Sequence, residues 1–103
     1  MAFNGTEGDP ISLSAAAVMT ARFRTNYPNH ARGRFFGKDL LLQIINQTNC
    51  KGIRMYFAQD ANNVMEIVIV GADGNENDML DLIGDVSCGC PSRCGNKNSL
   101  NGL

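Results

Sequence analysis

The strongest constraint on the fold is a pair of alternating apolar segments joined by a short turn. Over residues 52–59 apolar and polar side chains alternate, which is the pattern of a β-strand. The next four residues, Asp-Ala-Asn-Asn, include types that tolerate the left-handed conformations of tight turns. A second strand is expected over 64–70, so the two segments predict an antiparallel hairpin. Because this second strand is apolar on both faces, a further strand or a second copy of the chain is expected to cover it.

Two helices are expected before the hairpin. Ser12 is a good N-cap for the first, which should end before Pro28 because the residue preceding a proline is pushed out of the helical region. The second is expected over about 37–47, where leucines and isoleucines recur on one face. The predicted fold class is α+β, with two N-terminal helices packed on a small antiparallel sheet built around the hairpin, and a short cysteine-bearing C-terminal segment. Residues 79–86 are expected to form a third strand or a helical turn.

The chain length of 103 residues and the apolar content of 44% suit one domain with a modest core. We expect a flexible leader over 1–10, a single α+β domain over 11–95 that includes a basic loop at 29–34, and a flexible tail over 96–103. No apolar run approaches the roughly 20 residues of a membrane-spanning helix. The first ten residues lack the features of a secretory signal. The expected location is therefore the cytoplasm, with no membrane partner and with an exported form left open.

The net charge is −1, but the charges are segregated along the chain. Residues 20–38 contain five Lys and Arg residues and no acid, whereas residues 58–87 contain seven acids and no Lys or Arg. Such asymmetry can mark an anion-binding half, or complementary surfaces that pair within or between copies. The small basic segment and the negative net charge fall short of a nucleic-acid-binding footprint, so nucleic acid is not an expected partner.

Three of the four cysteines lie close together in the sequence VSCGCPSRCG at 86–95. Four thiolates suit a tetrahedral zinc site, so zinc is the candidate cofactor, and the candidate ligands are Cys50, Cys88, Cys90 and Cys94. The spacing lacks the paired knuckles of most structural zinc sites, however. A Cys90–Cys94 disulfide, a redox-active Cys88/Cys90 dithiol favoured by Arg93, and reduced thiols without a role are the alternatives. The sequence leaves all four open.

A basic segment precedes the second predicted helix and supplies a candidate anion site. Its candidate residues are Arg32, Arg34, Gly37 and Lys38. Gly37 is the expected helix start, where free backbone N–H groups and the positive end of the helix dipole favour an anion such as phosphate or a nucleotide. The alternative is that the two neighbouring phenylalanines pack in the core while the arginines are solvated. Neither a Walker pattern nor a G-x-G-x-x-G motif is present.

No catalytic set stands out from the sequence. The single histidine, His30, has no Ser or Cys nucleophile beside it in sequence, and the acids fall in turns. The acidic stretch at 73–78 offers alternating oxygen ligands, but it lacks the glycine and the final glutamate of an EF-hand loop. Enzymatic activity is left open, a non-enzyme is favoured, and no catalytic residue is assigned.

Three stretches of the chain resemble a group of short uncharacterised bacterial proteins of about this length: FFGKDLLLQIINQTNCKGIRMYFAQD, IVIVGADGNENDML and CPSRCG. The group has a Cys-x-Gly-Ile-Arg-x-Tyr strand, a Gly-x-Asp loop with later Asn and Asp, and a C-terminal Cys-Pro-x-x-Cys. The matching positions here are Cys50, Gly52, Arg54, Tyr56, Gly71, Asp73, Asp78, Cys90 and Cys94, whereas Cys88 is additional and Glu76 interrupts the loop. The resemblance implies the architecture over roughly 11–95 but no activity, and it favours Cys50, Cys90 and Cys94 as the relevant cysteines.

The leading functional hypothesis is a small non-enzymatic module that forms a homo-oligomer or binds a protein partner, with the cysteine segment as a stabilising clip. It rests on the apolar second face of the 64–70 strand, the segregated charge and the lack of a catalytic set. The alternatives are an anion- or nucleotide-binding protein that uses the basic segment, and a zinc-binding or thiol-redox protein that uses the cysteines.

Overall fold

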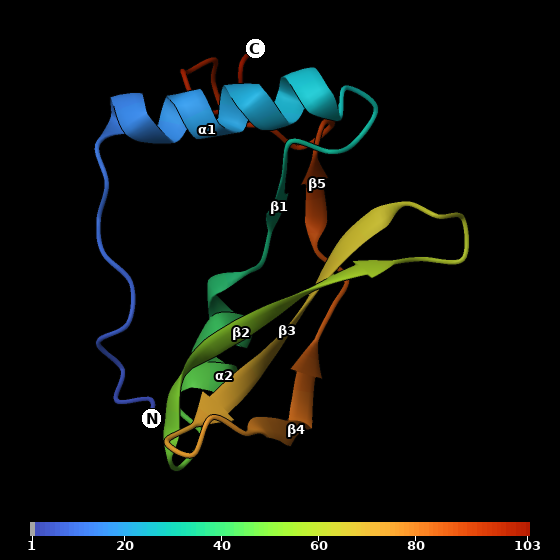
Figure 1. Ribbon diagram of the computed structural model, residues 1–103. Coiled ribbons are helices and arrows are strands. Elements are labelled where there is room, and N and C mark those ends of the chain that lie inside the picture. Colours follow the sequence, from blue (N-terminus) through green and yellow to red (C-terminus); the bar gives the residue numbers. More distant parts are fainter. Residues whose placement is uncertain (1) are drawn as a thin grey trace. The chain divides into compact units, whose positions relative to one another are not determined.

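The computed structural model describes residues 2–103, which form two helices and five strands (Figure 1). In chain order they are α1 (Leu13–Asn26), β1 (Gly33–Phe35), α2 (Lys38–Ile45), β2 (Cys50–Gln59), β3 (Met65–Asp73), β4 (Asp78–Gly84) and β5 (Cys88–Cys90). The strands pair antiparallel, which confirms the predicted α+β class. The chain divides into two units: the sheet unit (2–8 and 36–87) and the ribbon unit (Asp9–Phe35 and Cys88–Leu103). The expected leader, single domain and tail stay a prediction.

The sheet unit is built on the predicted hairpin. β2 pairs with β3 along almost its whole length, so both predicted strands are confirmed; β2 begins before its expected start, and β3 ends beyond its expected end. At the turn, the Asp60 carboxylate accepts bonds from the backbone N–H groups of Asn62 and Val64, at 2.8 and 3.0 Å. Asn63 has a φ of 64°, a left-handed conformation that asparagine tolerates better than most residues. This turn chemistry explains why Asp-Ala-Asn-Asn closes the hairpin.

β4 is the further strand that the apolar hairpin was expected to need. The sheet order is β2-β3-β4. A short turn leads into β4, and in it the Asp73 carboxylate accepts bonds from the backbone N–H groups of Asn75 and Asn77, at 2.9 and 3.0 Å. A bulge between Val70 and Gly71 shifts the register of β3 against β4. Of the two predictions for residues 79–86, the strand is confirmed.

α2 covers one face of this sheet. It contacts β2, β3 and β4, and its N-cap is Gly37, at the predicted start of the second helix. Gly84 lets the helix and sheet approach closely, because a Cβ there would lie 2.7 Å from Ile69 Cγ1 and 2.9 Å from Leu40 Cδ2. The core that results is small: its buried apolar side chains are Ile44, Ile69, Val70 and Ala72.

α1 belongs to the ribbon unit and begins and ends where the sequence predicts. Ser12 Oγ accepts a bond from the backbone N–H of Ala15 at 3.1 Å, and the helix ends at Asn26, before Pro28. None of its described residues is buried. Within the sheet unit, the helix that contacts the sheet is α2. No helix in the described range has the length and apolar content to cross a membrane.

β1 and β5 form a two-stranded antiparallel ribbon, with Gly33 opposite Cys90, Arg34 opposite Gly89 and Phe35 opposite Cys88. Residues 29–34 were expected to form a basic loop, and that prediction is wrong for Gly33 and Arg34, which lie in β1. The physical reason is that β5, far along the chain, supplies the partner strand for their backbone.

The C-terminal residues close a turn within the ribbon unit. The Asn98 side-chain carbonyl accepts bonds from the backbone N–H groups of Leu100 and Asn101, at 2.8 and 3.0 Å. Arg24 on α1 donates to the Leu100 carbonyl at 2.8 Å. The flexibility expected for 96–103 stays a prediction, and its described backbone is tied to α1.

Candidate functional site

A cavity of about 290 Å³ in the ribbon unit is the candidate site. Its lining comes from α1, from both strands of the ribbon, from the turn after β5 and from the C-terminal turn. Basic side chains and sulfur atoms gather there, and no acidic residue is among the described residues that line it. The basic and sulfur-bearing lining residues are Arg32, Arg34, Arg93, Cys88, Cys90 and Cys94.

A single turn brings two of these cysteines and Arg93 into the cavity wall. Cys90 and Cys94 form a disulfide, with their Cα atoms 4.8 Å apart. Between them the backbone N–H of Arg93 donates to the Gly89 carbonyl at 2.9 Å, which closes one α-turn that does not continue as a helix. Of the alternatives that the sequence left open for these cysteines, the Cys90–Cys94 disulfide is the one found in the structure.

Arg32 is held at the cavity by both its backbone and its side chain. Its backbone N–H donates to the Cys90 carbonyl at 2.5 Å, which continues the ribbon pairing beyond β1. Its Nη1 donates to the Asn101 carbonyl at 3.1 Å. A guanidinium carries five N–H donors. The bond to Asn101 therefore orients the group while using only part of its donor capacity.

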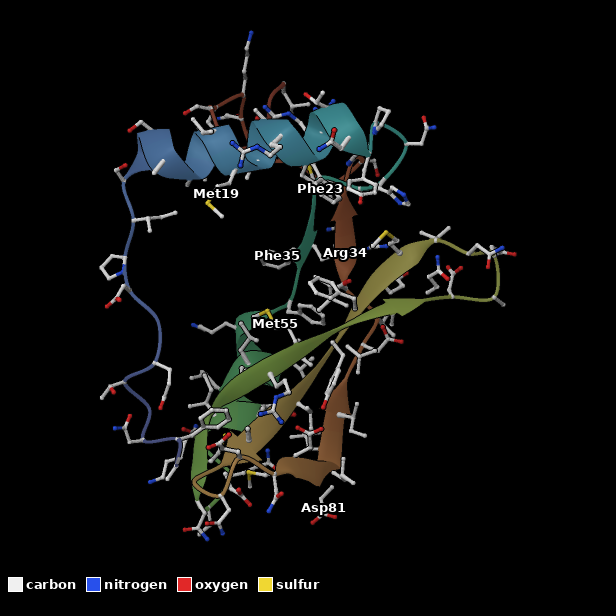
Figure 2. The ribbon with its side chains drawn as sticks, viewed as in Figure 1. Met19, Phe23, Arg34, Phe35, Met55 and Asp81 are labelled. Atoms are coloured by element: carbon white, nitrogen blue, oxygen red, sulfur yellow. A yellow bond between two sulfur atoms is a disulfide. The ribbon has the colours of Figure 1, made fainter. Side chains whose placement is uncertain are left out.

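Arg34 places its guanidinium over Gly89, on the face of the ribbon opposite to the side chains of Cys88 and Cys90. It is paired with Gly89, and a Cβ on Gly89 would lie 2.6 Å from Arg34 Nη1. Successive side chains of a strand alternate between faces, so Cys88 and Cys90 face the opposite way. Figure 2 shows Arg34 and Phe35 leaving β1 on opposite sides. Arg34 lines the cavity as well, but its Nη1 lies beside Gly89, so we take Arg32 and Arg93 as the candidate anion-binding residues.

The predicted anion set is divided between the two units. Arg32 and Arg34 belong to the ribbon unit, whereas Gly37 is the N-cap of α2 and Lys38 its first residue, both in the sheet unit. An anion site at the start of α2 stays a prediction. Arg93 was predicted only as a neighbour of the thiols, because the pairing of β1 with β5 has no local signature in the sequence.

The predicted zinc set is divided in the same way. Cys50 belongs to the sheet unit, where its Sγ donates to the Gly52 carbonyl at 3.2 Å and would lie 3.0 Å from a Cβ on Gly71. It is thus part of the packing of the sheet unit. Among residues 2–103, no three His, Cys, Asp or Glu side chains are arranged to hold a metal ion. Zinc as a cofactor stays a prediction that this geometry does not support.

A second polar cluster ties β2 to β4 across the sheet. Arg54 Nη1 donates to Oδ1 of Asp78 and the Tyr56 hydroxyl donates to Oδ2, both at 2.5 Å. The hydrogen bond from Tyr56 and, to a lesser extent, the one from Arg54 hold the pKa of Asp78 below its usual value. The Tyr56–Asp78 bond also raises the pKa of Tyr56. Arg54 is opposite Val70 and Asp78 is opposite Ala72, so the cluster lies on the face that these buried residues share. It therefore covers the apolar second face of the hairpin and acts as a structural tie.

The first described residues extend this second cluster. The Arg54 guanidinium lies 5.4 Å from the centroid of the Phe3 ring, and the Phe3 backbone N–H donates to the Gly74 carbonyl at 3.2 Å. A groove of about 360 Å³ is lined by Phe3 and Arg54 together with Glu7 and Lys51. Backbone N–H groups of the leader bind the Glu7 carboxylate and lower its pKa. This groove has an acidic residue in its lining, and its Arg54 is already paired with Asp78, so it is the weaker candidate for an anion site.

The positions that carry the resemblance to short bacterial proteins have structural roles here. Arg54, Tyr56 and Asp78 form one cluster, and the Cys90–Cys94 pair forms the disulfide. The resemblance itself stays a prediction. Comparison with protein-family models, with curated proteins and with solved structures finds no match.

Proposed function

We propose that the protein binds a small anion in the cavity of the ribbon unit. The observation that carries the proposal is the pair of guanidinium groups, Arg32 and Arg93, in a cavity whose described lining contains no acidic residue. Its volume of about 290 Å³ is at the lower end of the range for ligand pockets. The cavity therefore suits a ligand the size of phosphate or a short dicarboxylate.

The charge of the ribbon unit supports the same proposal. Its side chains include six Lys and Arg residues and one Asp, which is a net charge of +5. The sheet unit, with nine acids and three basic residues, carries −6, so the whole chain carries −1. Local charge of one sign attracts counter-ions even where the net charge is near zero. The ribbon unit is thus the half of the chain that attracts an anion.

Isothermal titration calorimetry with inorganic phosphate and with succinate tests this proposal. A hydrogen bond to a charged group contributes about 1.5–3 kcal/mol, so Arg93→Gln should weaken binding by roughly 10- to 100-fold. The glutamine retains the backbone bond to Gly89 that closes the turn. Arg22→Gln is the matched control, because it removes the same charge from an exposed position on α1 outside the cavity lining. Because solvent and salt screen the charge at this exposed position, Arg22→Gln should weaken anion binding by less than about twofold. Absence of binding to the wild-type chain, or equal weakening by the two variants, would refute the proposal.

Self-association is a second candidate function, favoured by an uncovered apolar face in the sheet unit. α2 has 8 residues and spans about 12 Å, whereas β2 has 10 residues and spans about 33 Å. The helix cannot cover the whole length of the strand, and Met55 and Phe57 on β2 are 59% and 84% exposed. β2 is also an edge strand of its sheet, where a second copy could pair.

Sedimentation velocity over a range of protein and salt concentrations tests self-association. A homodimer that buries this face should dissociate in Phe57→Glu, because the new carboxylate would be buried without a partner. Leu80→Glu is the control, since Leu80 is a 70% exposed apolar residue on β4. A chain that stays monomeric at high concentration and low salt would rule out this second function.

A further inference from the structure

The cavity wall contains a disulfide that a small molecule can reach. Cys90 and Cys94 both line the cavity, and neither is fully buried. The β1 residue opposite Cys90 is Gly33, where an added Cβ would meet no atom within 4 Å. Paired residues of neighbouring strands carry their side chains on the same face. The glycine therefore leaves open space beside Cys90.

Cys88 places a third sulfur atom on the same wall. It is two positions from Cys90 on β5, so both side chains lie on one face of the strand, and both residues line the cavity. Cys88 is a free thiol. A disulfide, a free thiol and the guanidinium groups of Arg32 and Arg93 thus share one small cavity.

We propose that the Cys90–Cys94 disulfide exchanges with small thiols that carry a carboxylate, sulfonate or phosphate group, and that Arg32 and Arg93 select these thiols by their charge. This inference rests on the proposed anion binding and names the substrate class of the same cavity. Positive charge near a disulfide also stabilises the thiolate that leaves when the S–S bond breaks, which favours exchange.

The exchange balances with two molecules of thiol. The first thiolate attacks one sulfur of the Cys90–Cys94 bond; a mixed disulfide forms, and the other cysteine leaves as a thiolate. The second thiolate attacks the small-molecule sulfur of the mixed disulfide and releases the remaining cysteine thiolate. Two electrons pass from the two thiols to the protein disulfide, and the two thiol protons go to solvent or to the new cysteine thiolates. The products are the small-molecule disulfide and the reduced chain.

The test compares three small thiols on the oxidised full-length chain: 2-mercaptoethanesulfonate (anionic), 2-mercaptoethanol (neutral) and cysteamine (cationic). Opening of the disulfide raises the number of cysteines that can be alkylated from two to four, which intact mass spectrometry counts over time. Rates are compared per thiolate and divided by the rates of the same thiols with a small neutral disulfide, because the nucleophilicity of a thiolate also falls with its pKa. Attraction by nearby guanidinium groups should make the anionic thiol react roughly tenfold faster than the cationic one.

Arg93→Gln tests whether charge selects the thiol, and Gly33→Val tests whether open space beside Cys90 lets thiols reach the disulfide. Arg93→Gln should reduce the anion-to-cation rate ratio several-fold, whereas Arg22→Gln, which removes the same charge outside the cavity lining, should leave it near the wild-type value. Gly33→Val fills the open space beside Cys90 and should slow all three thiols while leaving the ratio unchanged. Equal per-thiolate rates for the three thiols in the wild-type chain, or an unchanged ratio in Arg93→Gln, would overturn the inference.

The results also separate this inference from the proposed function. If phosphate or succinate binds but the three thiols react at equal rates, the exchange proposal fails and anion binding stands. If the anionic thiol is preferred but neither anion binds, charge-selected exchange stands and a stable anion complex is refuted. If neither effect is observed, both proposals fail.

Discussion

Gly84→Ala should destabilise the sheet unit, because a methyl group at this position of β4 has no room. The added Cβ would lie 2.7 Å from Ile69 Cγ1 and 2.9 Å from Leu40 Cδ2, where optimal carbon contacts are about 3.5–4.0 Å. Ile69 is fully buried and cannot move away. Overpacking of this kind costs about 1–3 kcal/mol. At about 4–8 °C per kcal/mol for a small domain, the midpoint of thermal unfolding should fall by roughly 5–20 °C.

Gly89→Ala on β5 is the matched control for that prediction. Its Cβ would lie 2.6 Å from Arg34 Nη1, as close an approach as at Gly84. The overlapping atom is the end of a flexible side chain, however, so Arg34 can move and the cost should be small. Thermal melts followed by far-UV circular dichroism compare the two variants. Adding Leu40→Ala to Gly84→Ala should show coupling, because the shortened side chain makes room for the methyl group. A wild-type melting temperature for Gly84→Ala would show that α2 does not pack on β4 at this glycine.

Three further predictions concern the tie across the sheet, the first helix and the disulfide. The pKa of Asp78 is lower in the folded chain than in the unfolded one, so the carboxylate contributes folding stability above about pH 4, and this contribution is lost as the pH falls through the folded pKa. When melting temperature is measured against pH, Asp78→Asn should therefore show a smaller fall in melting temperature at acid pH than the wild-type chain. Ser12→Ala removes the bond to the Ala15 N–H and should cost about 1 kcal/mol of helix stability, seen as reduced ellipticity and an earlier melt. Replacing both Cys90 and Cys94 by Ser should lower stability by about 2 kcal/mol, since the bond closes a short loop; an unchanged denaturant midpoint would contradict this.

Local sequence patterns predicted the elements whose cause is local. The Asp-Ala-Asn-Asn turn, the alternation on either side of it and the Ser12 cap each depend on neighbours within a few residues. The hairpin and both helices therefore follow from periodicity and turn chemistry. The α+β class follows in turn, because helices and an antiparallel hairpin are its components.

The candidate site was predicted only in part, because it is assembled from segments far apart in the chain. Arg32 was predicted as an anion-binding residue, and the pairing of Cys90 with Cys94 was one of the alternatives. Gly33 and Arg34 were placed in a loop because a three-residue strand carries no periodicity of its own. Their strand exists because β5 pairs with it, and the same pairing brings Arg93 to the cavity.

The amino-acid sequence by itself determined the helices, the hairpin and the nearness of the two bonded cysteines, since each depends on interactions between residues a few positions apart. Only the tertiary structure decided that Arg32 and Arg93 line one cavity and that the Arg34 guanidinium lies over Gly89. It also decided that Arg54 and Tyr56 meet Asp78 across β3. The physical reason is that strand register sets which distant side chains share a face, and register depends on the partner strand.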